Sequence, residues 1–157
     1  KGSAKLSIHT IPKMIFSCDI IGAQVGGALK NVIAIGCGMI KGNNLGESAR
    51  IAFMTRGLSE IIDLGTAMGG KLNTLGLSGL GDLALTCNSV QSRNFILGLN
   101  FTKPSKDGLA ETIEGFKTAG AANNLAKKFL IEVPIINTID LSLNERVSLN
   151  SSIKELL

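Results

Sequence analysis

The side chains best placed to do chemistry include a lysine inside a long apolar segment. Lys30 lies within residues 20–40, with apolar neighbours on both sides and glycines one turn upstream. A lysine held on a rigid helix can donate a proton to a substrate oxygen and accept it back in the reverse reaction. The simpler alternative is a lysine that extends its charged end to water along an apolar stem.

Two further patterns could bind a polar or anionic ligand. Asp82 follows a Gly-Leu-Gly sequence, so a tight turn could present its carboxylate, although an aspartate here could equally cap a helix before Leu83. Ser92, Arg93 and Asn94 precede an apolar run. A helix N-terminus offers free N–H groups, and arginine adds a two-pronged donor, which together suit a phosphate monoester. A capped helix with an exposed arginine is the plain alternative.

The elements that must position these residues are helices. Apolar spacing and end signals predict helices over residues 20–40, 47–68, 118–129, 134–143 and 147–157, a capped helix from Ser92, and a short strand over 14–16. The segment 75–85 is expected to be a short helix or a loop, and 87–91 to be irregular. The predicted fold class is therefore all-α. Ile51, Met54, Leu58, Ile61 and Ile62 should form the buried face of the second helix, and Gly22, Gly26 and Gly27 a flat surface on the first.

Residues 20–40 are long enough to cross a membrane. Lys30 and Asn31 fall near the middle, and a central lysine costs roughly 2.5–3.5 kcal/mol on insertion scales. We therefore expect a buried core helix and no membrane span.

Composition limits the classes of partner. The 157 residues are 45% hydrophobic and 18% charged, with a net charge of +4 and no Tyr or Trp. Disorder is excluded, and a small anionic ligand suits this balance better than nucleic acid. Cys18, Cys37 and Cys87 are odd in number and form no CxxC pair. We expect reduced, buried thiols in a cytoplasmic protein, with no disulfide framework and no metal site.

Four stretches in order resemble one family. They are IGAQVGGALKNVIA (21–34), residues 49–60 with the sequence RGLSE, GLGDLALTC (79–87) followed by SRN (92–94), and Glu114-Gly115. Together they are similar to the C-terminal, substrate-binding domain of bacterial NAD(P)-dependent glycerol-3-phosphate dehydrogenase. No glycine-rich dinucleotide fingerprint occurs, because Gly36-Cys37-Gly38 lacks the third glycine and a preceding strand.

The resemblance implies an all-α domain of the type found in 6-phosphogluconate dehydrogenase. Residues 18–157 would form this domain and 1–17 the tail of an N-terminal Rossmann domain, absent from this chain, that binds most of the NAD or NADP and sets the preference between them. The implied reaction interconverts dihydroxyacetone phosphate and sn-glycerol 3-phosphate for phospholipid precursor synthesis. The isolated chain is expected to be inactive, and a homodimer is possible.

The resemblance also assigns site residues. Lys30 becomes the proton-transfer residue, and Asp82 a substrate-site residue able to pair with it. Asn31, Ser92, Arg93 and Asn94 become substrate-binding residues, and Arg93 and Glu114 contact the cofactor.

Two assignments and two rival functions stay open. Thr86 could add a hydroxyl, and Thr112 replaces a usual aliphatic residue beside Glu114. The rivals are a related dehydrogenase acting on a carboxylate substrate and a non-catalytic helical interaction domain.

Overall fold

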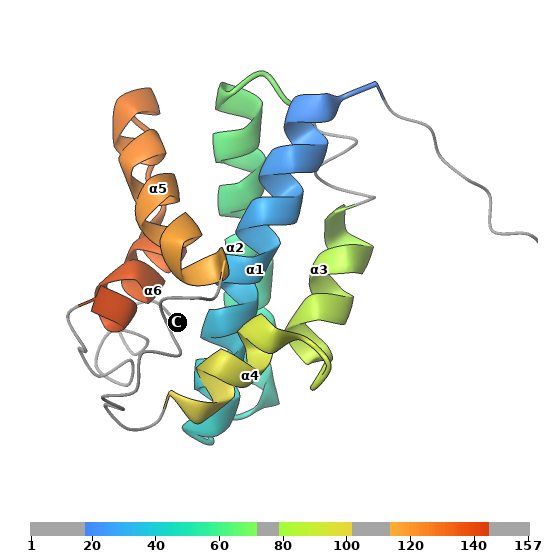
Figure 1. Ribbon diagram of the computed structural model, residues 1–157, viewed down its shortest axis with the longest axis vertical. Coiled ribbons are helices and arrows are strands. Elements are labelled where there is room, and N and C mark those ends of the chain that lie inside the picture. Colours follow the sequence, from blue (N-terminus) through green and yellow to red (C-terminus); the bar gives the residue numbers. More distant parts are fainter. Residues whose placement is uncertain (1–17, 72–78, 102–113, 145–157) are drawn as a thin grey trace, which may run out of the picture.

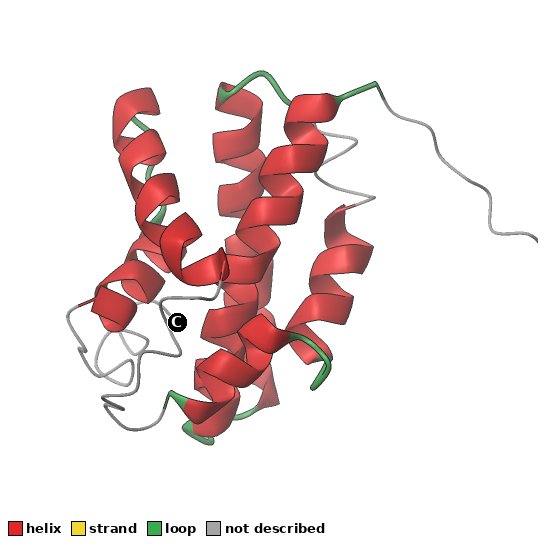
Figure 2. Cartoon of the chain, viewed as in Figure 1, coloured by secondary structure: helices red, strands yellow, loops and turns green. Residues whose placement is uncertain are grey.

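The computed structural model describes residues 18–71, 79–101 and 114–144, and all regular structure in these ranges is helical (Figure 2). The all-α prediction is therefore confirmed. The expected strand over 14–16 and the last helix over 147–157 lie outside the described residues. The helices are α1 (Ile20–Gly42), α2 (Glu47–Ala67), α3 (Gly79–Asn88), α4 (Arg93–Asn100), α5 (Glu114–Phe129) and α6 (Pro134–Asn144).

Helix α1 runs through the middle of the bundle, and the other five helices pack around it (Figure 1). The carboxylate of Asp19 accepts hydrogen bonds from the backbone N–H of Gly22 at 2.8 Å and of Lys71 at 2.7 Å. It therefore caps α1 and ties its start to the end of α2. Within the described residues α1 is the one helix long and apolar enough to cross a bilayer. Residues 32–40 are all buried by the neighbouring helices, as in the core helix of a bundle.

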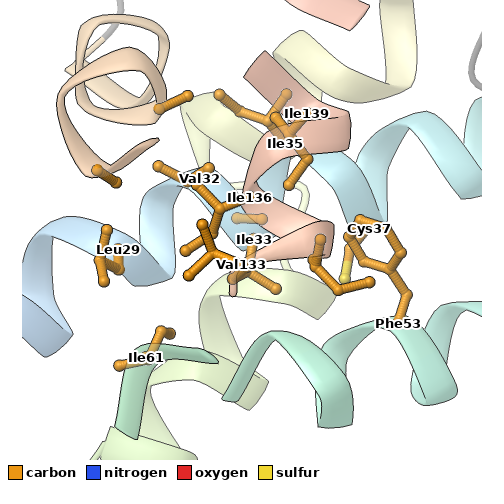
Figure 3. Close-up of a cluster of buried hydrophobic side chains, with 14 of the residues drawn as sticks. Leu29, Val32, Ile33, Ile35, Cys37, Phe53, Ile61, Val133, Ile136 and Ile139 are labelled. Carbon is orange, nitrogen blue, oxygen red and sulfur yellow. The ribbon is translucent and has the colours of Figure 1, made fainter. Parts of the chain in front are cut away.

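The core forms where α1, α2 and α6 meet (Figure 3). Ile33 of α1, Phe53 of α2 and Ile139 of α6 are completely buried. Glycines let the helices come this close. A Cβ atom added at Gly36 would clash with the Phe53 ring, and one added at Gly98 of α4 would meet the α1 backbone. A Cβ atom added at Gly38 of α1 would in turn meet the α4 backbone at Phe95. The close approach of α1 to α2 and α4 therefore uses Gly36 and Gly38, beyond the expected Gly22, Gly26 and Gly27.

Four expectations about elements were wrong. Helix α3 continues through Cys87 and Asn88, where irregular structure was expected. Of the helix and the loop expected before them, the described part is a helix, with Asp82 in its first turn. Helix α5 begins at Glu114, four residues before the predicted start at residue 118, so Glu114 and Gly115 are helical. Ile51 is 51% exposed, and the buried face of α2 carries Arg50 and Glu60 instead. Cys18 is exposed, whereas the other two cysteines are buried thiols.

Glu60 joins α2 to the N-terminus of α6. Its two carboxylate oxygens accept hydrogen bonds from the backbone N–H groups of Ile135 at 2.6 Å and Ile136 at 2.9 Å. Val133, the residue before Pro134, has no side-chain acceptor, so Glu60 supplies the cap from another helix. Burial raises the pKa of Glu60 to about 7, although the two N–H groups act in the opposite direction.

We expect this raised pKa to make folding stability depend on pH. Glu60 holds a proton more tightly in the folded chain, so its contribution is full below about pH 4.5 and is lost as pH rises through 7. The loss is on the order of 3 kcal/mol, since one pKa unit corresponds to about 1.4 kcal/mol. Urea unfolding at several pH values should show the wild-type advantage over Glu60→Gln shrinking by this amount between pH 4.5 and 8. If the free energy of unfolding had the same pH dependence in wild type and in Glu60→Gln, the expectation would be contradicted.

Candidate functional site

Lys30 and Asp82, 52 residues apart in the sequence, meet between α1 and α3. The ammonium Nζ of Lys30 lies 2.5 Å from Oδ2 of Asp82, and the two side chains are 24% and 50% exposed. A charged hydrogen bond this short holds the ammonium in one place while solvent or a ligand can still reach it. The pairing that the family resemblance suggested for Asp82 is present. The arrangement can hold a proton donor at an accessible surface.

Two glycines close in sequence to Lys30 and Asp82 have open space where a side chain would be. A Cβ atom built on Gly27 of α1, or on Gly81 of α3, meets no described atom within 4 Å. Gly27 lies one turn before Lys30 and Asn31, and Gly81 directly precedes Asp82. Packing within the described residues therefore gives no reason for a missing side chain at either position, whereas a ligand close to the backbone would.

Asn31, Asn94 and Gly115 converge where α1, α4 and α5 meet. A Cβ atom added at Gly115 would lie 2.6 Å from Oδ1 of Asn94 and 3.2 Å from the carbonyl oxygen of Asn31. Oδ1 of Asn94 is buried and has no hydrogen-bond partner among the described residues. A buried acceptor left without a donor costs about 1–3 kcal/mol, so a hydroxyl or amide N–H of a bound ligand would be stabilising here. The side-chain amide of Asn31 makes a 3.4 Å contact with the Gly27 carbonyl.

Ser92 and Arg93 form the start of α4. The Ser92 hydroxyl accepts the backbone N–H of Phe95 at 3.3 Å, so Ser92 is the N-cap. Arg93 is exposed, and no hydrogen bond or ion pair to another described residue restrains its guanidinium. This geometry agrees with a capped helix that carries an exposed arginine. It agrees equally with an arginine whose guanidinium is available to bind an anion.

The remaining predicted groups contribute less. Glu114 is the first residue of α5, and its side chain and Thr112 lie outside the described residues. The Thr86 hydroxyl donates to the Asp82 carbonyl at 2.7 Å, one turn back in α3, so it is engaged by its own helix. No group of three or more potential metal ligands occurs in the part of the chain that the structure describes.

Sequence reasoning missed Arg50 as a residue linked to this site. It is 7% exposed and donates a hydrogen bond to the Cys87 carbonyl near the end of α3. The signal that could have found it is its spacing. Arg50 lies three residues before Phe53 and seven before Gly57, which places it on the buried face of α2.

Comparisons with known proteins agree with the resemblance seen in the sequence. The family described as NAD-dependent glycerol-3-phosphate dehydrogenase C-terminus matches residues 19–154. Glycerol-3-phosphate dehydrogenase [NAD(P)+] of Ruegeria sp. is 46% identical over 140 residues, which cover 88% of this chain and 44% of the relative. The protein of the same name from Rhodospirillum rubrum is 48% identical over 147 residues, 90% of this chain and 42% of the relative.

A solved structure has the same fold. The crystal structure of glycerol-3-phosphate dehydrogenase from Coxiella burnetii superposes with a TM-score of 0.82 at 38% identity, and the match covers 89% of this chain and 45% of that one. The chain thus spans less than half the length of the relatives and of the solved structure that it matches.

Proposed function

This chain belongs to the family of C-terminal domains of NAD-dependent glycerol-3-phosphate dehydrogenases, and we propose that it forms the substrate-binding and catalytic half of such an enzyme. The reaction is the interconversion of dihydroxyacetone phosphate and sn-glycerol 3-phosphate. The observation that carries the proposal is the Lys30–Asp82 pair, held between α1 and α3 beside two glycines with open space above them.

Reduction of a ketone needs a hydride at carbon and a proton at oxygen. The Lys30 ammonium donates that proton to the carbonyl oxygen as the carbonyl becomes an alcohol, and takes it back in the reverse reaction. Asp82 holds the ammonium in place through the 2.5 Å hydrogen bond. Arg93, which makes no hydrogen bond or ion pair with another described residue, binds the phosphate together with the N-terminal end of α4. Asn31 and Asn94 contact the substrate hydroxyl and carbonyl groups beside the lysine.

A dinucleotide fits the residues at the junction of α4 and α5. Oδ1 of Asn94 is a buried acceptor without a donor among the described residues, and the glycine at position 115 lets α5 pack closely beside it. Arg93 and Glu114, at the starts of these two helices, would hold the NAD or NADP there, and its nicotinamide ring supplies the hydride. Most of the dinucleotide would be held by a separate nucleotide-binding domain, since this chain has no glycine-rich fingerprint.

The open space above Gly27 gives a direct prediction. Alanine is about 1 kcal/mol more favourable than glycine inside a helix, so Gly27→Ala should stabilise the fold. The new methyl group would nevertheless enter the ligand space, where overpacking costs about 1–3 kcal/mol, or roughly 5- to 150-fold in kcat/KM. We expect a raised Tm together with a lowered kcat/KM.

Gly120→Ala in α5 is the matched control. Its Cβ atom would make an ordinary 3.4 Å contact with Asp140, and neither Gly120 nor Asp140 is close in sequence to Lys30 or Asp82. It should raise Tm and leave kcat/KM unchanged. If Gly27→Ala also leaves kcat/KM unchanged, the space above Gly27 is not a ligand site.

Substrate choice tests the proposal against its rivals. NADH and NADPH oxidation by the enzyme carrying both domains should be measured with dihydroxyacetone phosphate and with a series of 2-oxo acids. We expect turnover with the phosphorylated ketone only. Turnover of a 2-oxo acid alone would favour a carboxylate-specific dehydrogenase of the same superfamily, and turnover of neither would favour an interaction domain.

The proposed setting of the enzyme follows from the same function. We propose that it acts in the cytoplasm in phospholipid precursor synthesis, with its own nucleotide-binding domain as the principal protein partner. The buried free thiols of Cys37 and Cys87 suit a reducing compartment. A homodimer is also proposed, and sedimentation of the enzyme with both domains would test it.

A further inference from the structure

Helix α3 is short and is held by few buried side chains. Its 10 residues bury Leu83 and Cys87, which lie one turn apart and face α1. Asp82 directly precedes Leu83, so the position of α3 along α1 determines whether the Asp82 carboxylate reaches Lys30. The 2.5 Å contact between the two side chains therefore depends on where α3 lies against α1.

A buried arginine of α2 forms a hydrogen bond with the C-terminal end of α3. The Nη1 of Arg50, in α2, donates to the Cys87 carbonyl oxygen at 3.3 Å. Cys87 is the second-last residue of α3, and the last carbonyl groups of a helix have no partner within it. These carbonyl groups carry partial negative charge, so a guanidinium is favourable at this end.

The guanidinium is itself held in one orientation. Its Nε donates to Oε2 of Glu47 at 2.8 Å, while Lys41, at the end of α1, donates to Oε1 at 2.9 Å. Hydrogen bonds from Lys41 first, and then from Arg50, lower the pKa of Glu47 to about 2, so this carboxylate is charged at neutral pH. The network therefore links the end of α1, the start of α2 and the end of α3.

An apolar residue could fill the same place at lower desolvation cost. Burying a guanidinium is unfavourable unless its hydrogen bonds are made, and replacing buried ionic groups by well-packed apolar ones is often neutral or stabilising. Stability alone thus gives little reason for arginine at a position that is 7% exposed. What arginine adds is a directional bond that sets the position of one helix end.

We infer that Arg50 is a positioning residue for proton transfer: it holds α3 at the place along α1 where Asp82 meets Lys30. The inference rests on the proposed function, because it assigns Arg50 a role in the same reaction. Arg50 touches neither reacting atom, and its effect passes through Asp82.

A double-mutant cycle on kcat tests this role in the enzyme carrying both domains. The four proteins are wild type, Arg50→Gln, Asp82→Asn and the double variant, assayed with dihydroxyacetone phosphate. Misplacing a catalytic group by about 1 Å can cost on the order of 100-fold, so we expect Arg50→Gln to lower kcat by roughly 10- to 100-fold with a smaller change in KM. In the Asp82→Asn background the same substitution should cause no further loss of kcat.

Controls separate positioning from loss of the fold. Arg56→Gln removes an exposed arginine from the same helix and should leave kcat unchanged. Arg50→Lys keeps the charge and a single donor and should recover part of the lost kcat. If Arg50→Gln does not fold, Glu47→Gln replaces it in the cycle, because it loosens the guanidinium without removing it.

Each outcome has a distinct meaning. An equal loss of kcat in both backgrounds, or no loss in either, would overturn the positioning role while leaving the Lys30–Asp82 site in place. Full kcat in Asp82→Asn alone would instead overturn the proposed function of the site, and the inference with it.

Discussion

Replacing Lys30 by methionine or by arginine in the enzyme that carries both domains should lower kcat by roughly 10²- to 10⁴-fold, the usual contribution of a general acid–base group. Methionine removes the amine and keeps most of the side-chain volume. Arginine keeps the charge, but its guanidinium does not deprotonate in proteins, so it cannot exchange the proton. Both variants should be nearly inactive.

The structure also predicts that both Lys30 variants stay folded. The ion pair with Asp82 lies at the surface, where such pairs contribute about 0–1 kcal/mol to stability. In Lys30→Met the half-exposed Asp82 carboxylate would lose its ion-pair partner but would be solvated by water. Thermal unfolding should therefore show only small changes in Tm.

Other roles of Lys30 predict different relative values of kcat and Tm for the methionine and arginine variants. If the ammonium acts only through its charge, arginine should restore activity and methionine should not. If the side chain acts only in packing, methionine should behave like wild type, and arginine should lower Tm because it is too large for the site. Measuring kcat and Tm for both variants distinguishes these cases, and an active Lys30→Met enzyme would remove the basis of the proposed mechanism.

Arg93→Lys should weaken the use of the phosphorylated substrate even though the charge is kept. A single ammonium cannot reproduce the two parallel hydrogen bonds of a guanidinium to phosphate. The expected loss in kcat/KM is about 1.5–3 kcal/mol, or roughly 10- to 150-fold. Because Arg93 is exposed and unpaired with any described residue, Tm should not change.

A matched control for Arg93 is Lys127→Arg, since Lys127 is an exposed cation in the last turn of α5. Its exchange should alter neither kcat/KM nor Tm. If Arg93→Lys matches wild type within twofold, Arg93 is a surface residue and the phosphate is bound elsewhere.

The helices that follow apolar spacing could be predicted from the sequence. Helix α1 and helix α6 were predicted, because apolar spacing and end signals are local in the chain. For α3 the sequence left both a helix and a loop open, because Gly79 and Gly81 favour a turn by themselves. The helix forms because Leu83 and Cys87 pack on α1, a contact that depends on residues far away in the sequence.

The site could be predicted only in part. Residue types and family resemblance singled out Lys30 and Asp82, but composition and spacing could not show that residues 52 positions apart make an ion pair. Arg50 and Glu60 were missed because charged residues on a helix are expected to face water. Each one instead bonds to the backbone end of another helix, which no local pattern reveals.

Chemical rescue of Lys30→Ala tests the central claim most directly, because it asks whether a proton-bearing amine is what position 30 supplies. The enzyme with both domains would be assayed with dihydroxyacetone phosphate and increasing concentrations of methylammonium, ethylammonium or tetramethylammonium. The account predicts that the primary amines restore kcat, to an extent that follows their acidity, and that tetramethylammonium does not. Equal activation by tetramethylammonium, or no activation by any amine in a folded variant that still binds substrate and cofactor, would contradict it.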